Sequence, residues 1–175
     1  MKKYLYLIAA TLTLGLAACS NSHKKIDGDG TGGTAGDGGT LPLDSNVAMN
    51  RLPDGVNPDS ADYSVLQAYI VHFDFDSFTI KASERPKLEA VAKWLSENPN
   101  AKLVIAGHTD SRGTIQYNVA LGERRAIATR DYLLGLGANS AALTTISYGK
   151  ERPAQQGENE SAWAANRRAE FGVIR

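Results

Sequence analysis

The stretch from Gly107 to Ala126 holds residues whose types and spacing could bind a charged ligand. Asp110 lies in a polar loop that follows an apolar run. The next segment has a helical pattern, and residues spaced at i, i+3 and i+7 share one helix face: Asn118, Leu121 and Arg125. A helix that only packs on a core carries apolar residues along such a stripe. The polar groups therefore predict a small pocket for a ligand with charges of both signs.

Two interpretations of Asp110 and Arg125 remain open from the residues alone. A carboxylate can accept an ammonium group, and a guanidinium can bind a carboxylate through two parallel hydrogen bonds. The glycines that flank the loop, Gly107 and Gly113, allow tight turns and close backbone approach, and the free N–H groups at the start of the helix favour anions. These features suit the amine and carboxylate of an amino acid. The alternative is a structural Asp110–Arg125 salt bridge that fastens the loop to the helix.

A metal site is a weaker interpretation. His108 and Asp110 form an H-x-D pair, and His72, Asp74 and Asp76 alternate with phenylalanines along the first expected strand. A metal centre needs three or four converging ligands, whereas solvation of one strand face explains the alternation without metal. We therefore predict no metal and no cofactor.

Catalysis is also not indicated. Asp74 and Asp76 could imitate the carboxylate pair of a glycosidase, but no array of sugar-binding aromatic residues accompanies them. Ser111 lies near His108 without a nucleophile elbow around it. We predict no catalytic residue, and we keep a hydrolase that uses His108, Asp110 or Asp76 as an alternative.

The composition is that of an ordinary soluble globular protein, with 42% hydrophobic and 22% charged residues. The 175 residues include 19 basic and 19 acidic ones, and loss of Lys2 and Lys3 with a leader leaves 17 basic against 19 acidic. Non-specific nucleic-acid binding needs a basic surface, so we predict no nucleic-acid partner.

Residues 1–18 are expected to be a signal peptide and Cys19 a lipidation site. Lys2 and Lys3 precede an apolar stretch that is too short for a comfortable membrane span. The stretch ends in LAAC, which resembles the signal of a bacterial lipoprotein; acyl chains on Cys19 would then anchor the protein. Ser20, in place of aspartate, favours the outer membrane. The alternatives are an ordinary secretory signal and a short uncleaved anchor.

Residues 19–62 are expected to form a tether with an extended lead-in that packs partly on the domain. Seven of the 17 glycines lie between Gly28 and Gly39, a composition that cannot bury a core. A calcium loop starting at Asp27 fails, because Thr31 and Gly38 stand where ligands are needed. The tether would span roughly 35 Å on average and about 140 Å at full stretch.

Residues 63–175 are expected to form one α+β domain. The patterns predict a β-α-β-α-β-β order, with two helices on one face of a mixed four-stranded sheet, as a two-layer sandwich. Ser83 is expected to cap the first helix, and glycine near 137 to end the second. The expected strands are 69–75, 101–106, 143–148 and 168–174, the helices are 83–97 and 116–136, and 149–165 is loop with a helical turn near 162–165.

Five ordered motifs resemble the OmpA-like C-terminal domain family, and specifically its peptidoglycan-associated lipoproteins. They are VHFDFDS (71–77), GHTDSRGT (107–114), YNVALGERRA (117–126), SYGKERP (147–153) and NRRAEF (166–171). Two positions depart from the family pattern: Ala106 and Ser111 stand where acids are frequent.

The resemblance implies binding of the meso-diaminopimelate side chain of peptidoglycan. By motif, Asp110 would hold the ligand's ammonium group and Arg125 its carboxylate. Asn118 and Leu121 would line the pocket. The remaining implied ligand-binding residues are Thr109, Arg112, Phe75, Asp76 and Ser77.

The resemblance also implies a mechanical function, in which an outer-membrane lipoprotein facing the periplasm holds the cell wall without catalysis. The implied partners are peptidoglycan, the periplasmic β-propeller protein TolB and the inner-membrane Tol complex, with a role in envelope integrity and cell division. The alternatives are an OmpA-like envelope lipoprotein outside the Tol system and the anchored hydrolase.

Overall fold

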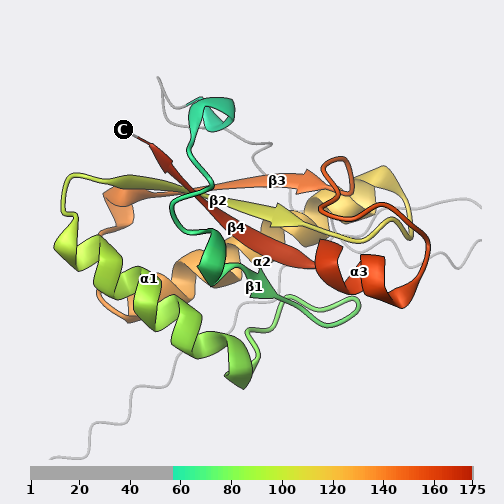
Figure 1. Ribbon diagram of the computed structural model, residues 1–175, viewed down its shortest axis with the longest axis horizontal. Helices are drawn as coiled ribbons and strands as arrows, with labels where there is room; N and C mark the ends of the chain where they lie inside the picture. Colours follow the sequence, from blue (N-terminus) through green and yellow to red (C-terminus); the bar gives the residue numbers. More distant parts are fainter. Residues whose placement is uncertain (1–56, 175) are drawn as a thin grey trace, which may run out of the picture. The chain divides into compact units, whose positions relative to one another are not determined.

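Four strands form one mixed sheet in the computed structural model, which describes residues 57–174 (Figure 1). The strand order is β1-β4-β2-β3; β2 and β3 are parallel, and β4 is antiparallel to both of its neighbours. The α+β prediction is therefore correct, and a third helix is added to it. The strands are β1 (Val71–His72), β2 (Lys102–His108), β3 (Leu143–Gly149) and β4 (Arg168–Ile174), and the helices are α1 (Arg85–Glu97), α2 (Ile115–Gly135) and α3 (Glu160–Asn166).

Helix α1 packs its apolar stripe on the sheet as predicted. Leu88, Val91 and Leu95 are buried in the main core. The predicted cap is wrong: Ser83 lies inside a 3-10 turn (Ala82–Glu84), and the N-cap position is taken by Glu84 without a side-chain cap bond. The carboxylate of Glu84 is used elsewhere, because it accepts hydrogen bonds from the His72 amide and from Lys87, both at 2.9 Å.

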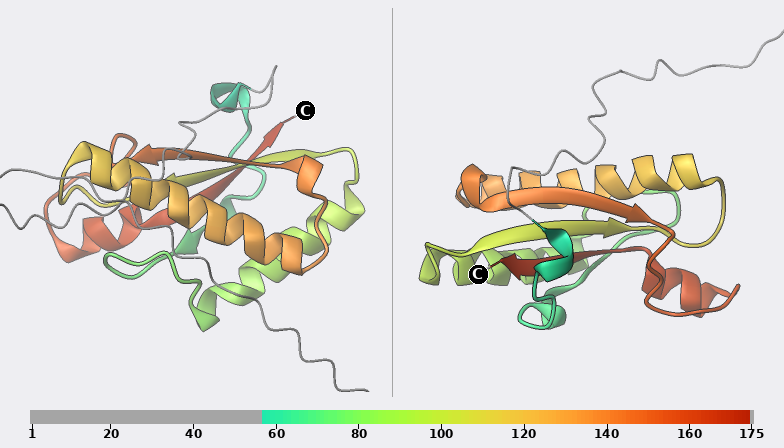
Figure 2. Two further views of the ribbon diagram at one scale, coloured as in Figure 1. Left: turned by 180° about the vertical axis from the view of Figure 1, so that it is seen from behind. Right: turned by 90° about the horizontal axis from the view of Figure 1, so that it is seen from above.

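Helices α1 and α2 contribute side chains to the same core, and α2 is in front of the strands when the molecule is seen from behind (Figure 2). The Thr114 side chain caps its start by accepting from the Tyr117 amide, and Gly137, at φ +93°, follows its end. Contact with β2 is very close, because a Cβ on Gly107 would lie 1.9 Å from the Gly122 carbonyl oxygen. Two glycines thus bring the start of α2 against the end of β2.

Strand β2 is buried on both faces, as its run of consecutive apolar residues predicted. Leu103 and Ile105 belong to the core under the helices. Val104 and Ala106 belong to a second cluster, which Tyr63 helps to cover. The lead-in packs here: Asp62 and Val173 exchange backbone hydrogen bonds of 2.9 and 3.0 Å. The Ala106 departure therefore places a small apolar side chain in this second cluster.

The first strand is much shorter than predicted. Instead of 69–75, it covers only Val71–His72, and the Phe73 amide still donates to Arg167. The chain then turns, with Asp76 at φ +51°, a conformation that a strand cannot contain. As a result Phe73 is in the core and Phe75 is 62% exposed, although strict alternation would place them on one face.

The segment before β4 contains a real helix rather than a single turn. Asn159 caps α3 by accepting from the Ala162 amide at 3.0 Å, and the helix extends to Asn166. Its position beside the loop after β2 becomes important for the site.

The expected signal peptide, the lipidation of Cys19, the glycine-rich tether and the rejected calcium loop all lie outside the described residues. Within residues 57–174, no helix is both long and apolar enough to cross a membrane.

Candidate functional site

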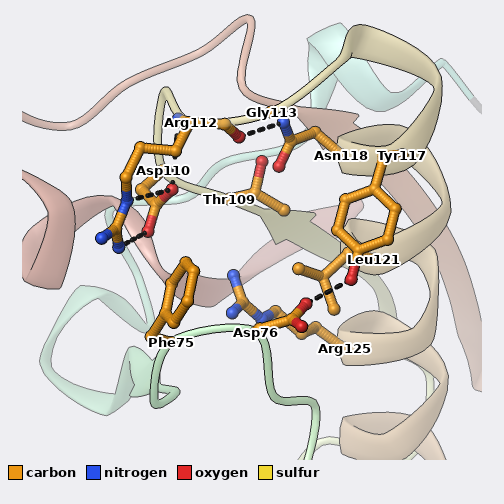
Figure 3. Close-up of a pocket in the computed structure, with 10 residues that line it drawn as sticks. All are labelled: Phe75, Asp76, Thr109, Asp110, Arg112, Gly113, Tyr117, Asn118, Leu121 and Arg125. Atoms are coloured by element: carbon orange, nitrogen blue, oxygen red, sulfur yellow. Dashed lines mark hydrogen bonds and ion pairs between the residues drawn. The ribbon is translucent and has the colours of Figure 1, made fainter.

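A pocket lies between the loop after β2, the first half of α2 and the turn between β1 and α1 (Figure 3). Eight of the nine residues that the sequence suggested for ligand binding line it together. The ninth, Ser77, lies just behind, where its carbonyl oxygen accepts a hydrogen bond from Arg125. The full lining is Phe75, Asp76, Thr109, Asp110, Arg112, Gly113, Tyr117, Asn118, Leu121 and Arg125.

Arg125 is 0% exposed and binds three backbone carbonyl groups. Its Nε donates to Ser77 at 2.8 Å, and its two terminal nitrogens donate to His108 at 2.8 Å and Asp74 at 3.1 Å. A guanidinium has five N–H donors, so two have no partner among the described residues. Burial lowers the pKa of Arg125 to about 10, which leaves the group charged at neutral pH. The pocket therefore contains a fixed, buried cation with donors to spare.

Asp110 does not pair with Arg125, so the structural salt bridge considered from the sequence is absent. Its Oδ2 lies 2.6 Å from one terminal nitrogen of Arg112 and 3.5 Å from one of Arg167. The side chain is only 7% exposed. Although burial alone raises the pKa of Asp110, hydrogen bonds and charge from Arg112 lower it below its usual value, so the group is a carboxylate.

Arg112 lies over two aromatic rings. Its guanidinium carbon is 4.1 Å from the ring centroid of Phe75 and 4.1 Å from that of Trp163, which comes from α3. Cation–π contacts of this kind hold a guanidinium in a defined position. The Trp163 indole N–H donates to the Ser111 hydroxyl at 3.1 Å, so α3 is fastened to the loop that carries Asp110. The Ser111 departure from the family pattern therefore serves an internal contact.

Asn118 shapes the loop. Its side-chain nitrogen donates to the carbonyl groups of Arg112 at 2.7 Å and Thr114 at 2.9 Å. Leu121, one turn later, lies between Asn118 and Arg125 along the same wall of the pocket, and Thr109 projects between the loop and the helix (Figure 3). The shared helix face predicted from the spacing is confirmed, with Asn118 positioning the loop backbone.

Asp76 and Tyr117 close the other side. The Tyr117 hydroxyl donates to Asp76 Oδ1 across the pocket (Figure 3). Asp76 has φ +51°, a left-handed conformation that aspartate tolerates better than most residues. Its turn brings the carbonyl groups of Asp74 and Ser77 onto Arg125. The early end of β1 is thus what completes the cradle around the guanidinium.

Sequence reasoning missed Tyr117, Trp163 and Arg167. Tyr117 lies within a family motif one residue before Asn118, which was a usable signal. Trp163 lies in the expected helical turn near 162–165, and nothing local indicated its contact with Arg112. Arg167 is buried and donates to Phe73, Asp110 and Glu160, so it forms structural ion pairs.

The geometry gives little support to the catalytic and metal-binding alternatives. His108 is 2% exposed, and burial lowers its pKa to about 3, so it is a neutral core side chain. The Ser111 hydroxyl donates to Glu158 at 2.7 Å. Residues 57–174 contain no cluster of three or more His, Cys, Asp or Glu side chains suited to a metal ion.

Comparison with known proteins agrees with the fold and the motifs. The OmpA family description matches residues 72–167. The peptidoglycan-associated lipoprotein of Agrobacterium fabrum is 39% identical over 163 residues, which cover 93% of this chain and 84% of that protein. The chain belongs to the OmpA family and groups with the peptidoglycan-associated lipoproteins.

Two solved structures resemble this chain. The crystal structure of the peptidoglycan-associated lipoprotein from Burkholderia pseudomallei is 41% identical and covers 60% of this chain and 89% of that one, with a TM-score of 0.59. The C-terminal domain of Helicobacter pylori MotB is 21% identical, with a TM-score of 0.57 over 61% of this chain and 84% of that one. The second likeness concerns the fold alone.

Proposed function

We propose that this protein binds peptidoglycan non-covalently, taking the diaminopimelate side chain of a stem peptide into the pocket at Asp110 and Arg125. The observation that carries the proposal is a buried carboxylate and a buried guanidinium that line one pocket without pairing with each other. A free amino-acid centre presents the two complementary charges. Membership among the peptidoglycan-associated lipoproteins supports the choice of ligand.

Arg125 would bind the ligand's carboxylate through its two remaining N–H groups. The three carbonyl groups already fix the guanidinium, so little conformational entropy is lost on binding. Because Arg125 is fully buried, the ligand reaches it only when exposed side chains at the rim rotate aside.

Asp110 would bind the ammonium group. Arg112 and Arg167 balance its charge, and the 3.5 Å contact with Arg167 is the weaker of the two. An ammonium group arriving at the carboxylate therefore replaces a long contact rather than a short one. Thr109, Asn118 and Leu121 shape the space between the two charged ends.

The proposal is tested by sedimenting full-length protein with purified sacculi. Asp110→Asn keeps the size of the side chain and removes its charge. We expect retention on sacculi to fall at least tenfold, because this is the loss of affinity that follows from losing one hydrogen bond to a charged group. Arg124→Gln, at an exposed position next to Arg125, is the matched control and should bind like wild type. Undiminished binding by a folded Asp110→Asn protein would refute the pocket assignment.

Arg125 is a poor first choice for this test. Its removal takes the donor from three backbone carbonyl groups, of which that of His108 is buried, and a buried unsatisfied carbonyl group costs about 1–3 kcal/mol. If Arg125→Ala lost binding, the result could come either from the missing ligand contact or from unfolding of the pocket wall, and the experiment would not distinguish the two causes.

Anchoring is a second part of the proposal. Residues 1–18 would be removed as a signal peptide, Cys19 would carry acyl chains in the outer membrane, and 19–62 would tether the domain 63–175 in the periplasm. Palmitate labelling that is present in wild type and lost in Cys19→Ser would support this anchor; no labelling of wild type would remove it.

The most specific part of the proposal is a role with TolB and the Tol complex in envelope integrity and cell division. It is supported by the family resemblance. Crosslinking in cells distinguishes it from an OmpA-like lipoprotein outside that system, since only the first should crosslink to TolB. The relatives are named as lipoproteins rather than enzymes, and release of soluble fragments from sacculi would revive the hydrolase alternative.

A further inference from the structure

We propose that Arg112 is a second anion-binding group of the pocket, oriented by Trp163, and that it binds a carboxylate of the stem peptide other than the one at Arg125. This inference rests on the proposed function and specifies it further. The ligand would then be recognised as a peptide with two separate carboxylates around one ammonium group, rather than as a single amino-acid centre.

The first support is the number of donors that Arg112 leaves free. Its Nε and one terminal nitrogen donate to the Asp110 carboxylate at 3.3 and 2.6 Å. Three of its five N–H donors have no partner within residues 57–174. The side chain lines the pocket and is 32% exposed, so these donors can be reached from solvent. Figure 3 shows one side of the guanidinium engaged by Asp110.

The second support is that the guanidinium is held in place before any ligand arrives. Asp110 fixes one edge, and the rings of Phe75 and Trp163 each lie 4.1 Å from its central carbon. An arginine on the surface usually loses much side-chain entropy when it binds an anion. Here that loss has already occurred on folding, which favours binding of a planar carboxylate.

The third support is the local charge. Beneath the pocket, two buried guanidinium groups, Arg125 and Arg167, face one buried carboxylate, Asp110. The other partner of Arg167 is Glu160, whose side chain is 68% exposed and screened by solvent. The other acids near Arg112 and Arg125, which are Asp76 and Glu158, are exposed as well and are screened in the same way. Among the buried groups there is one more positive charge than negative charge, and this balance favours an additional anion.

Trp163 is assigned a positioning role. Its ring supports Arg112, and its indole N–H bonds to the Ser111 hydroxyl and to Glu158, at 3.1 and 3.3 Å. Helix α3 is therefore connected to the loop of the pocket through a side chain that need not touch the ligand.

The test pairs protein variants with ligand variants in calorimetric titration of the full-length protein in detergent. The probes are a soluble muramyl tripeptide ending in diaminopimelate, and two forms amidated at one carboxylate each: that of isoglutamate, or that of the diaminopimelate centre joined to the peptide. We expect one of the two amidations to weaken binding to wild type about tenfold, and the same amidation to have no further effect on Arg112→Gln.

Trp163→Leu and Trp163→Phe test the positioning role. Trp163→Phe keeps a ring for Arg112 and should retain discrimination between acid and amide ligands, whereas Trp163→Leu should lose most of it. If Trp163→Leu folds normally but no longer discriminates between acid and amide ligands, general destabilisation of the protein does not explain the result.

The outcomes separate the two proposals. If wild type binds the tripeptide but responds to each amidation as Arg112→Gln does, the second anion site is wrong and the proposed function stands. If wild type binds none of the three tripeptides, both are wrong. If Trp163→Leu discriminates as well as wild type, the positioning role of Trp163 is wrong.

Discussion

At Arg125, the guanidinium that faces the pocket also fastens three pieces of backbone. The carbonyl groups come from the turn after β1 and from the end of β2, so one side chain of α2 joins three segments. From the sequence, a ligand clamp and an Asp110–Arg125 salt bridge were the alternatives. The salt bridge is absent, and Arg125 instead binds backbone carbonyl groups, which leaves two of its N–H groups for the proposed ligand contact.

The pairing of Asp110 could not be predicted from residue types. Arg112, Arg125 and Arg167 were all available partners, and the sequence gives no distance between them. The loop conformation decides: the Asp110 carboxylate accepts from the backbone amide of Arg112 and from its side chain. The identity of the pocket residues was thus predictable by motif, while their electrostatic partners depended on the fold.

His108 provides a prediction at the same scale. The pKa of its ring falls from 6.5 to about 3 through burial, with Arg168 adding to the effect. Between these values the unfolded chain binds a proton that the folded chain does not, so stability falls as the pH is lowered from 6.5. His72, whose pKa is also lowered by burial, acts in the same direction.

We expect wild type to lose about 1–2 kcal/mol of unfolding free energy between pH 6.5 and pH 5, at up to about 1.4 kcal/mol per pH unit for His108. His108→Phe removes the titrating group and should flatten this slope. Urea denaturation at the two pH values measures it, and an equally steep loss in His108→Phe would contradict the assignment.

At the scale of elements, the position of α2 depends on its glycines. A Cβ on Gly122 would lie 2.3 Å from the Ser147 hydroxyl oxygen and 3.0 Å from the Gly107 carbonyl oxygen. No atom lies within 4 Å of a Cβ built on Gly135, near the end of the same helix. Alanine substitutions at these two positions therefore distinguish the effect of packing on stability from the effect of helix propensity.

Gly122→Ala should destabilise the domain by about 1–3 kcal/mol through overpacking. Gly135→Ala should stabilise it by up to about 1 kcal/mol, because alanine is the better helix former. Thermal unfolding of both proteins provides the comparison. Equal shifts of the same sign would mean that the close approach of α2 to β2 is not what limits residue 122.

The elements were predictable where hydrophobic periodicity or a capping residue marks them. α1, α2, β2, β3 and β4 follow such signals, with boundary shifts of at most two residues. β1 was overestimated because Phe73 and Phe75 alternate like a strand. The turn that ends it is stabilised by Arg125, which lies 50 residues later in the chain, and no local pattern contains that information.

At the scale of the whole molecule, the sheet joins distant parts of the chain. β4 lies between β1 and β2, and its residues pair with both. Arg167, immediately before it, also contacts Asp110 and Glu160. The residues that line the pocket span 75 to 125, and Asp110 among them is held from behind by Arg167, so no short fragment contains the pocket with its support.

Removal of 168–174 should therefore abolish the folded domain rather than trim it, because β1 and β2 would both lose their shared partner. Deletion of 20–56 leaves all four strands in place and should preserve the fold. Circular dichroism and limited proteolysis distinguish the outcomes. A protease-resistant domain without 168–174 would contradict this view of the sheet.

The inner position of β4 also bears on how the chain is made. Synthesis proceeds from the N-terminus, so the strand at the middle of the sheet is the last of the four to leave the ribosome. Until it emerges, β1 has no neighbour and β2 has only one. The nascent chain thus stays unable to complete its sheet while most of it is already synthesised. If the protein is exported as proposed, a translocation channel that admits only unfolded polypeptide would meet it in that state.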